Sequence, residues 1–155
     1  DYYYFNSDNG MEETGLKNVN GKYYYFGPTM TKNTEKKVNG SWYYFGSDGA
    51  AKTGWYTLSD GRLVNYNSQG QMYHGEAKIN NKWYYFTSGG AMVTGWKQIN
   101  NKWYYFETSG VMATSKWING TYYVKSSGVM AVNEWVDGGK YYVDAKGKYV
   151  PGKKK

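Results

Sequence analysis

Short aromatic runs alternate with polar segments along the chain and recur about every 20 residues. The clearest runs are Trp83-Tyr84-Tyr85-Phe86 and Trp103-Tyr104-Tyr105-Phe106, and related runs end at positions 5, 26, 45, 66, 124 and 143. Because Tyr, Trp and Phe favour strands, each run bounded by polar residues predicts a β-strand. The spacing predicts a single array of about eight copies of one β unit over residues 1–150.

The residues that precede each aromatic run predict a hairpin. A short strand, such as residues 95–99, is followed by a turn pair such as Asn39-Gly40 or Asn119-Gly120. Asn-Gly between two strands is a strong hairpin signal, because type I′ turns need a positive φ at both central residues. A lone hairpin is marginal in water, so consecutive hairpins must cover one another. The predicted fold is therefore all-β, with the hairpin repeats stacked as a β-solenoid.

Side-chain alternation assigns the rings of each aromatic strand to two faces. Trp103 and Tyr105 face one way, and Tyr104 and Phe106 face the other. One set is expected to meet the next hairpin and the other set the previous hairpin. Methionine recurs six residues after the end of most runs, and its flexible side chain suits irregular gaps between hairpins. These methionines are Met11, Met72, Met92, Met112 and Met130.

Composition determines the kind of core and excludes several kinds of site. With 20 Tyr, seven Trp and five Phe, the core must be aromatic rather than aliphatic. The chain has no cysteine, which excludes disulfides and thiolate metal sites. The adjacent pair Glu12-Glu13 points to opposite faces of an extended chain, and the single histidine, His74, has no nucleophile motif around it. We therefore predict no catalytic residues, no metal site and no cofactor.

The charge pattern argues against a nucleic-acid partner. The formal net charge is +7, and three of the positive charges are Lys153, Lys154 and Lys155. They follow Pro151-Gly152, so residues 151–155 are interpreted as a basic tail or linker. The remaining excess is spread along the chain instead of gathering on one face. No segment approaches the roughly 18 consecutive apolar residues of a membrane span.

The repeats resemble a known family. Residues 95–106, followed by Ser109-Gly110-Val111-Met112, resemble the cell-wall-binding repeat superfamily. Its members include the choline-binding modules of pneumococcal surface proteins and phage lysins, and the glucan-binding repeats of glucosyltransferases are close relatives. The resemblance implies a left-handed superhelix of hairpins with ligands held between consecutive hairpins. In choline-binding members an aromatic cage holds the quaternary ammonium through cation–π attraction.

Carried onto this sequence, the resemblance implies one complete choline cage. Trp96 and Trp103 would form two walls, Tyr122 of the next hairpin the third, and Met112 the floor. Trp55 matches a wall position too, although its hairpin has Leu63 where an aromatic residue is expected. In three other units the wall position departs from tryptophan, and the residues there are Leu16, Glu35 and Glu76.

Glucan remains the alternative ligand. Glu76 beside Trp83 offers a polar edge and a ring face, as a sugar requires, and Tyr104 lies on the face of its hairpin that looks back. The predicted function is a non-catalytic module that anchors a secreted Gram-positive protein or enzyme to the cell wall or cell surface. The leading ligand is choline of teichoic acid, and the alternative is α-glucan. The oligomeric state is left open.

Overall fold

The fold consists of β-hairpins and the segments that connect them. The computed structural model describes residues 2–155, which contain fourteen strands in seven two-stranded antiparallel sheets. The strands are β1 (Gly15–Val19), β2 (Lys22–Phe26), β3 (Thr34–Val38), β4 (Ser41–Phe45), β5 (Gly54–Thr57), β6 (Leu63–Tyr66), β7 (Gly75–Ile79), β8 (Lys82–Phe86), β9 (Gly95–Ile99), β10 (Lys102–Phe106), β11 (Lys116–Ile118), β12 (Tyr122–Val124), β13 (Glu134–Val136) and β14 (Tyr141–Val143). Each odd-numbered strand pairs with the strand that follows it.

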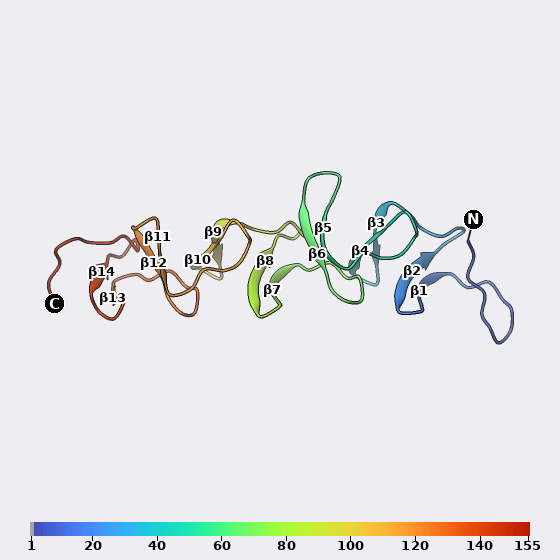
Figure 1. Ribbon diagram of the computed structural model, residues 1–155, viewed down its shortest axis with the longest axis horizontal. Coiled ribbons are helices and arrows are strands. Elements are labelled where there is room, and N and C mark those ends of the chain that lie inside the picture. The colour runs from blue at the N-terminus through green and yellow to red at the C-terminus, as the bar shows by residue number, and fades with distance from the viewer. Residues whose placement is uncertain (1) are drawn as a thin grey trace. The chain divides into compact units, whose positions relative to one another are not determined.

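The chain divides into two compact units. The first runs to His74 and includes Ser88–Ala91, and the second contains Gly75–Thr87 and Met92–Lys155. Hairpins β1–β2, β3–β4 and β5–β6 belong to the first unit, and the four hairpins from β7 to β14 belong to the second (Figure 1). The predicted all-β fold of stacked hairpin repeats is confirmed. The continuity of all repeats in a single array stays a prediction.

The hairpin turns have the positive φ angles that their Asn-Gly and Asn-Asn pairs predict. Asn39 and Gly40 have φ values of 49° and 85°, and Asn100 and Asn101 have 48° and 60°. Positive φ at both central residues defines a tight turn whose twist matches that of the flanking strands. In the first repeat the run that ends at Phe5 forms an isolated bridge with the connecting segment, and its partner there is Glu12 instead of the expected Met11.

The connecting segments join neighbouring hairpins by backbone hydrogen bonds. The N–H of Met112 donates to the carbonyl of Trp83, and the N–H of Met130 donates to the carbonyl of Trp103, each over 2.8 Å. Met112 also forms a bridge with Phe106 of its own hairpin. In these repeats the segment after a hairpin therefore acts as a short third strand and also bonds to the hairpin before it.

Met30 does not follow the six-residue spacing of the other methionines. Met30 lies four residues after Phe26, not six, and it forms the same bridge to the end of its hairpin. The loop Gly27-Pro28-Thr29 is two residues shorter than its counterparts, so the methionine reaches the same place from a different position in the sequence.

Rings from each aromatic strand separate to two faces, as alternation predicts. Tyr105 packs on the cluster formed by Ile118 and Val124 of the next hairpin. Phe106 faces back, and its ring centroid lies 6.3 Å from that of Tyr85. The core is consequently a series of small clusters between neighbouring hairpins, with Phe86, Phe106 and Val124 almost fully buried.

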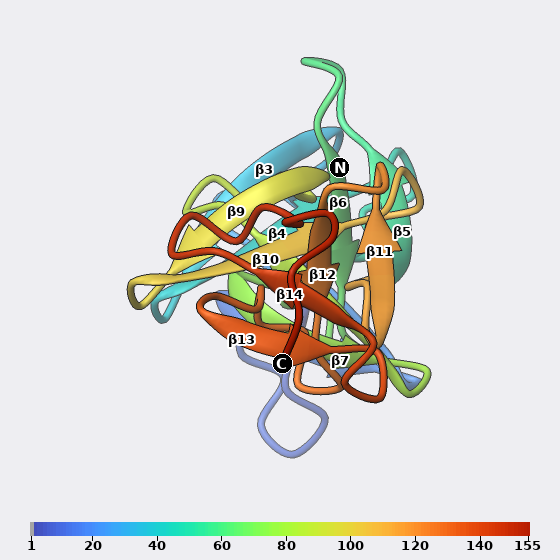
Figure 2. The same ribbon diagram turned by 90° about the vertical axis from the view of Figure 1, so that its left-hand side faces the viewer.

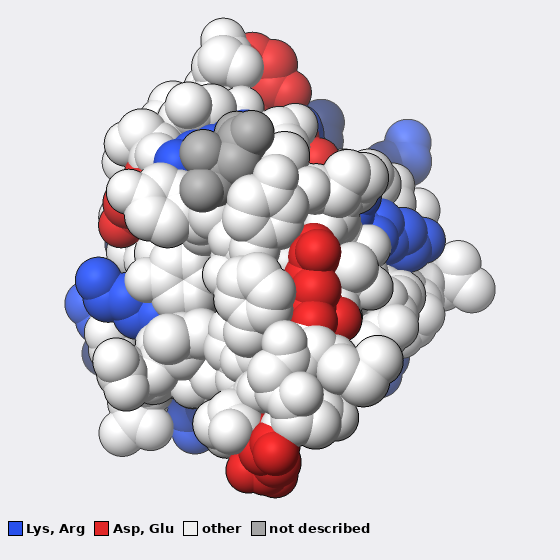
Figure 3. Space-filling model, turned by 90° about the vertical axis from the view of Figure 1, so that its right-hand side faces the viewer, with Lys and Arg blue, Asp and Glu red and all other residues white. Residues whose placement is uncertain are grey.

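Within the second unit, each hairpin is turned relative to the one before it. Figure 2 shows that β9–β10, β11–β12 and β13–β14 run in clearly different directions. On the face shown in Figure 3, lysine and arginine side chains are interspersed with aspartate, glutamate and uncharged surface. Among residues 2–155 no helix has the length and hydropathy needed to cross a membrane.

The first prediction concerns a glycine that lets hairpins approach closely. Gly70 has a φ of +80°, and a Cβ there would lie 2.8 Å from the Cβ of Ala51. Gly70→Ala should lower the free energy of unfolding by about 1–2 kcal/mol through backbone strain and by about 1–3 kcal/mol more through overpacking. Urea denaturation followed by tryptophan fluorescence measures the loss.

Gly61 supplies the matched control for this variant. Its φ is +86°, and a Cβ there would meet open space. Gly61→Ala should therefore show the strain alone. Equal losses for the two variants would contradict close packing between the Gly70 loop and the preceding repeat.

Candidate functional site

One position on the first strand of each hairpin varies in chemical character from repeat to repeat. We call it the cage position, defined as the residue paired with the second-to-last residue of the aromatic run. It is Trp96 opposite Tyr105, and Glu76 opposite Tyr85. Along the chain the cage positions are Leu16, Glu35, Trp55, Glu76, Trp96, Trp117 and Trp135.

The Trp96 cavity is lined mainly by aromatic rings. It has a volume of about 380 Å³ and is lined by Trp96, Trp103, Tyr122, Met130 and Lys146. Trp96 and Tyr122 meet edge to face, with ring centroids 5.3 Å apart and planes at 73°. Trp103 is 41% exposed, so one side of its indole is open to a ligand. Ring faces that converge on one space are suited to an organic cation.

The structure brings Trp96, Trp103 and Tyr122 together but does not place Met112 with them. Met130 lines this cavity instead. The reason is the hydrogen bond from the Met130 N–H to the Trp103 carbonyl, which brings the connecting segment of the next hairpin under the cavity. A sequence pattern alone does not tell which of two neighbouring connecting segments lies beneath a given pair of rings.

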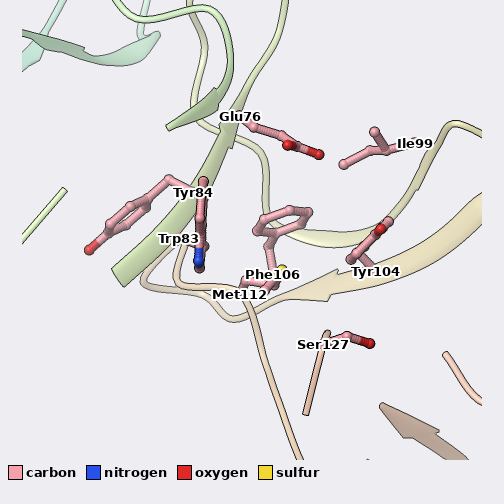
Figure 4. Close-up of a pocket in the computed structure, with 8 residues that line it drawn as sticks. All are labelled: Glu76, Trp83, Tyr84, Ile99, Tyr104, Phe106, Met112 and Ser127. Atoms are coloured by element: carbon pink, nitrogen blue, oxygen red, sulfur yellow. The ribbon is translucent and has the colours of Figure 1, made fainter. Parts of the chain in front are cut away.

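Met112 lines the preceding cavity, which also contains Glu76, Trp83 and Tyr104. This cavity has a volume of about 250 Å³, and its other lining residues are Tyr84, Ile99, Phe106 and Ser127. Figure 4 shows Trp83 nearly edge-on, with Glu76 and Phe106 on the same side of its indole and Tyr84 projecting away from them. Glu76 stands where Trp96 stands in the next repeat, so a carboxylate replaces one ring.

A loop from a third hairpin completes each cavity. Lys146, in the loop after β14, lines the Trp96 cavity, and Ser127, in the loop after β12, lines the Glu76 cavity. The loop approaches so closely that a Cβ on Gly128 would lie 2.6 Å from the Sδ of Met112. Each cavity therefore draws side chains from three consecutive repeats. Lys146 and Ser127 could not be predicted from the pattern of two adjacent hairpins, because each lies in the loop of a third hairpin.

In the first unit, the equivalent cavity already holds a cation of the protein itself. The cavity is lined by Glu35, Trp42, Arg62, Met72, His74, Ser88 and Gly89. Arg62 donates from Nη2 to Oε2 of Glu35 over 2.7 Å and from Nε to Oδ2 of Asp60 over 2.6 Å. A further Arg62 hydrogen bond reaches the carbonyl of Gly89. Hydrogen bonds to Asp60, and then to Glu35, hold the pKa of Arg62 above its usual value.

Family models match most of this repeat pattern. Models described as choline-binding repeats match residues 73–117 and 111–149. A model described as a putative cell wall binding repeat matches residues 14–29 and 36–51. This chain belongs to the choline-binding repeat family. The comparison with curated proteins found no match.

Solved choline-binding proteins from Streptococcus pneumoniae share the fold. Choline binding protein F is 38% identical, with a TM-score of 0.80, over 96% of this chain and 54% of that one. CbpJ is 35% identical, with a TM-score of 0.81, over 96% of this chain and 55% of that one. The modular autolysin LytC is 27% identical, with a TM-score of 0.69, over 88% of this chain and 33% of that one. The chain thus spans about half the length of the first two structures.

Two further repeats of the chain differ from the Trp96 arrangement. Trp117 makes edge-to-face contacts with the rings of Tyr141 and Tyr149, with both centroids 5.6 Å away. Tyr149 stands where other repeats have methionine, so its ring occupies space beside Trp117. Trp55 lies on β5 and is 40% exposed. In its hairpin the first residue of the second strand is Leu63, at the position that Trp103 occupies in the Trp96 hairpin. A ligand role for Trp55 stays a prediction.

The second prediction tests Arg62 as the resident cation of the Glu35 cavity. Arg62→Ala removes three hydrogen bonds and leaves Glu35, whose side chain is 25% exposed, without its ion pair. The free energy of unfolding should fall by about 1–2 kcal/mol, as expected for a partly screened charged hydrogen-bond cluster. Urea denaturation at low and high salt measures the loss, which should shrink as salt rises.

Lys102→Ala is the control, because Lys102 precedes Trp103 as Arg62 precedes Leu63. Within residues 2–155 the structure records no ion pair for Lys102. Its replacement should change stability by less than about 0.5 kcal/mol. The assignment of Arg62 fails if both variants lose the same amount.

Proposed function

We propose that this chain anchors a secreted protein to choline-bearing teichoic acid through the Trp96 cavity. The observation that carries the proposal is the convergence of Trp96, Trp103 and Tyr122 on one open space lined by a methionine. A quaternary ammonium has no N–H to donate, so it depends on ring faces for binding. The cavity offers those faces and no carboxylate among its lining residues.

Lys146 fits the same ligand when choline is present as its phosphate ester. Its ammonium would repel a bare cation, although it also offers a partner for a phosphate next to the choline. A zwitterionic phosphocholine group therefore matches the combination of rings and lysine better than free choline does.

A single cavity of this kind binds weakly. Three rings at about 0.5–2 kcal/mol each correspond to an affinity near the millimolar range. Firm attachment then requires several repeats, or several copies, to engage one polymer that presents many ligands. Repeating sites on a repeating polymer fit the role of an anchor, and an enzyme attached elsewhere in the protein would be held at its substrate. Export from the cell is part of this proposal.

The third prediction removes one ring face from the Trp96 cavity. Trp96→Leu keeps an apolar side chain but loses the aromatic face, so choline affinity should fall about tenfold while the fold is retained. The indole N–H signal of Trp103 in NMR titrations with choline reports this site separately from the others.

Trp135→Leu is the matched control, because it removes the same ring from the last cage position of the chain. It should leave the Trp103 response to choline unchanged. If Trp96→Leu binds choline as tightly as the parent protein does, the rings of this cavity serve packing and not recognition.

The fourth prediction separates choline from glucan. The chain should be retained on a resin that carries tertiary amine groups and should elute with free choline. Soluble dextran at the same concentration should not displace it. Elution by dextran and not by choline would replace the proposed ligand with α-glucan.

A further inference from the structure

We propose that the Glu76 cavity is a second kind of site, which binds a primary or secondary ammonium group in place of a quaternary one. The backbone arrangement is that of the Trp96 cavity, because Trp83, Tyr104 and Met112 correspond to Trp103, Tyr122 and Met130. The difference lies at the cage position, where the carboxylate of Glu76 replaces an indole.

That replacement changes which cation gains most from the cavity. A quaternary ammonium carries no N–H and is satisfied by ring faces alone. A primary ammonium carries three N–H donors and must replace its hydration with acceptors when it is bound. Glu76 offers charged acceptor oxygens, while Trp83 still offers a ring face. The pair therefore matches an ammonium that can donate hydrogen bonds.

The first unit of the same chain contains a precedent for this chemistry. Glu35 occupies the cage position and Trp42 the place of Trp83, and the cation between them is the guanidinium of Arg62. That cation donates N–H groups to the carboxylate, with an Nη2–Oε2 distance of 2.7 Å. A carboxylate and an indole in this arrangement thus hold a cation that has N–H donors.

The Glu76 cavity lacks such an internal cation. Throughout the described part of the chain, no lysine or arginine forms an ion pair with Glu76. Lys102, at the position that corresponds to Arg62, is not among the lining residues. Lys78 holds its ammonium 5.8 Å from the centroid of the Trp83 ring, but it does not line the cavity either. The carboxylate is left available to a ligand.

The loop that each cavity receives from a third hairpin also separates the Glu76 cavity from the Trp96 cavity. Ser127 lies at the place that Lys146 has in the Trp96 cavity, so no positive side chain lines the Glu76 cavity. Glu76 is the charged residue among its lining residues. The cavity volume is about 250 Å³, against about 380 Å³ for the Trp96 cavity.

The ammonium could come from an amino sugar of a wall glycan or from an ethanolamine ester. Both present the same primary ammonium, and the experiment separates them. NMR titrations at about pH 6, where amines are protonated and glutamate is ionised, follow the indole N–H of Trp83. Ethanolamine, glucosamine and choline are the probes. The preferred probe of the two amines identifies the source, and either preference supports the site.

Glu76→Gln is the decisive variant, because it keeps the size of the side chain and removes its charge. Ethanolamine and glucosamine should bind about tenfold more weakly at Trp83, as expected for loss of a charged hydrogen bond. Choline should lose only about threefold or less, since it loses a screened Coulomb attraction and no hydrogen bond. Glu35→Gln is the control and should leave the Trp83 response unchanged.

Glu76→Trp provides the reciprocal test. It rebuilds the ring arrangement of the Trp96 cavity, so the Trp83 signal should then respond to choline more strongly than to ethanolamine. An unchanged ratio of ethanolamine to choline affinity in both variants would overturn the proposal. So would binding of N-acetylglucosamine, which has no ammonium, as tightly as glucosamine, because the site would then recognise a neutral sugar.

The proposal and the choline-anchoring function fail separately. The Trp103 signal reports choline in the Trp96 cavity, and the Trp83 signal reports amines in the Glu76 cavity. Loss of the choline response at Trp103 would count against the anchoring function alone. A missing amine response at Trp83 in the parent protein would count against the Glu76 site alone.

Discussion

A two-stranded hairpin cannot bury its own aromatic faces, and the rest of this structure follows from that constraint. Each hairpin here has rings on both faces, so each needs a neighbour on either side. Backbone hydrogen bonds from the connecting segments, such as that from Met112 to Trp83, fix the step from one hairpin to the next. Because the step is set by the backbone, the cavities of corresponding repeats share a similar form, and side chains are free to vary within it.

The cage position shows how far that variation goes. Leucine at position 16 joins the packed cluster of the next hairpin, glutamate at position 35 pairs with Arg62, and tryptophan at position 96 faces an open cavity. One backbone arrangement thus supports a purely structural contact, an internal ion pair and an open cavity lined by aromatic rings.

Much of the fold could be predicted from the sequence because its signals are local. Asn39-Gly40 specifies its turn by the backbone it needs, and strand alternation correctly separates Tyr105 from Phe106. The walls of the Trp96 cavity could be found for the same reason, since they follow from alternation on two adjacent hairpins. Met130 and Lys146 could not, because their places depend on which connecting segment bonds to which hairpin and on a loop two repeats away. Those are relations between repeats, and a repeat period does not reveal them.

The sharing of each cavity among three consecutive repeats has a consequence for how such arrays diversify. If a recombination event removed the repeat that contains β9 and β10, Glu76 and Trp83 would face Tyr122 and Met130, with the Lys146 loop above them. The result would be a hybrid pocket that joins a carboxylate wall to a basic loop, assembled from existing side chains without a point mutation. Unequal crossing-over between repeats would therefore change the lining of the cavities as well as the length of the array, because every new junction would combine parts of two former cavities.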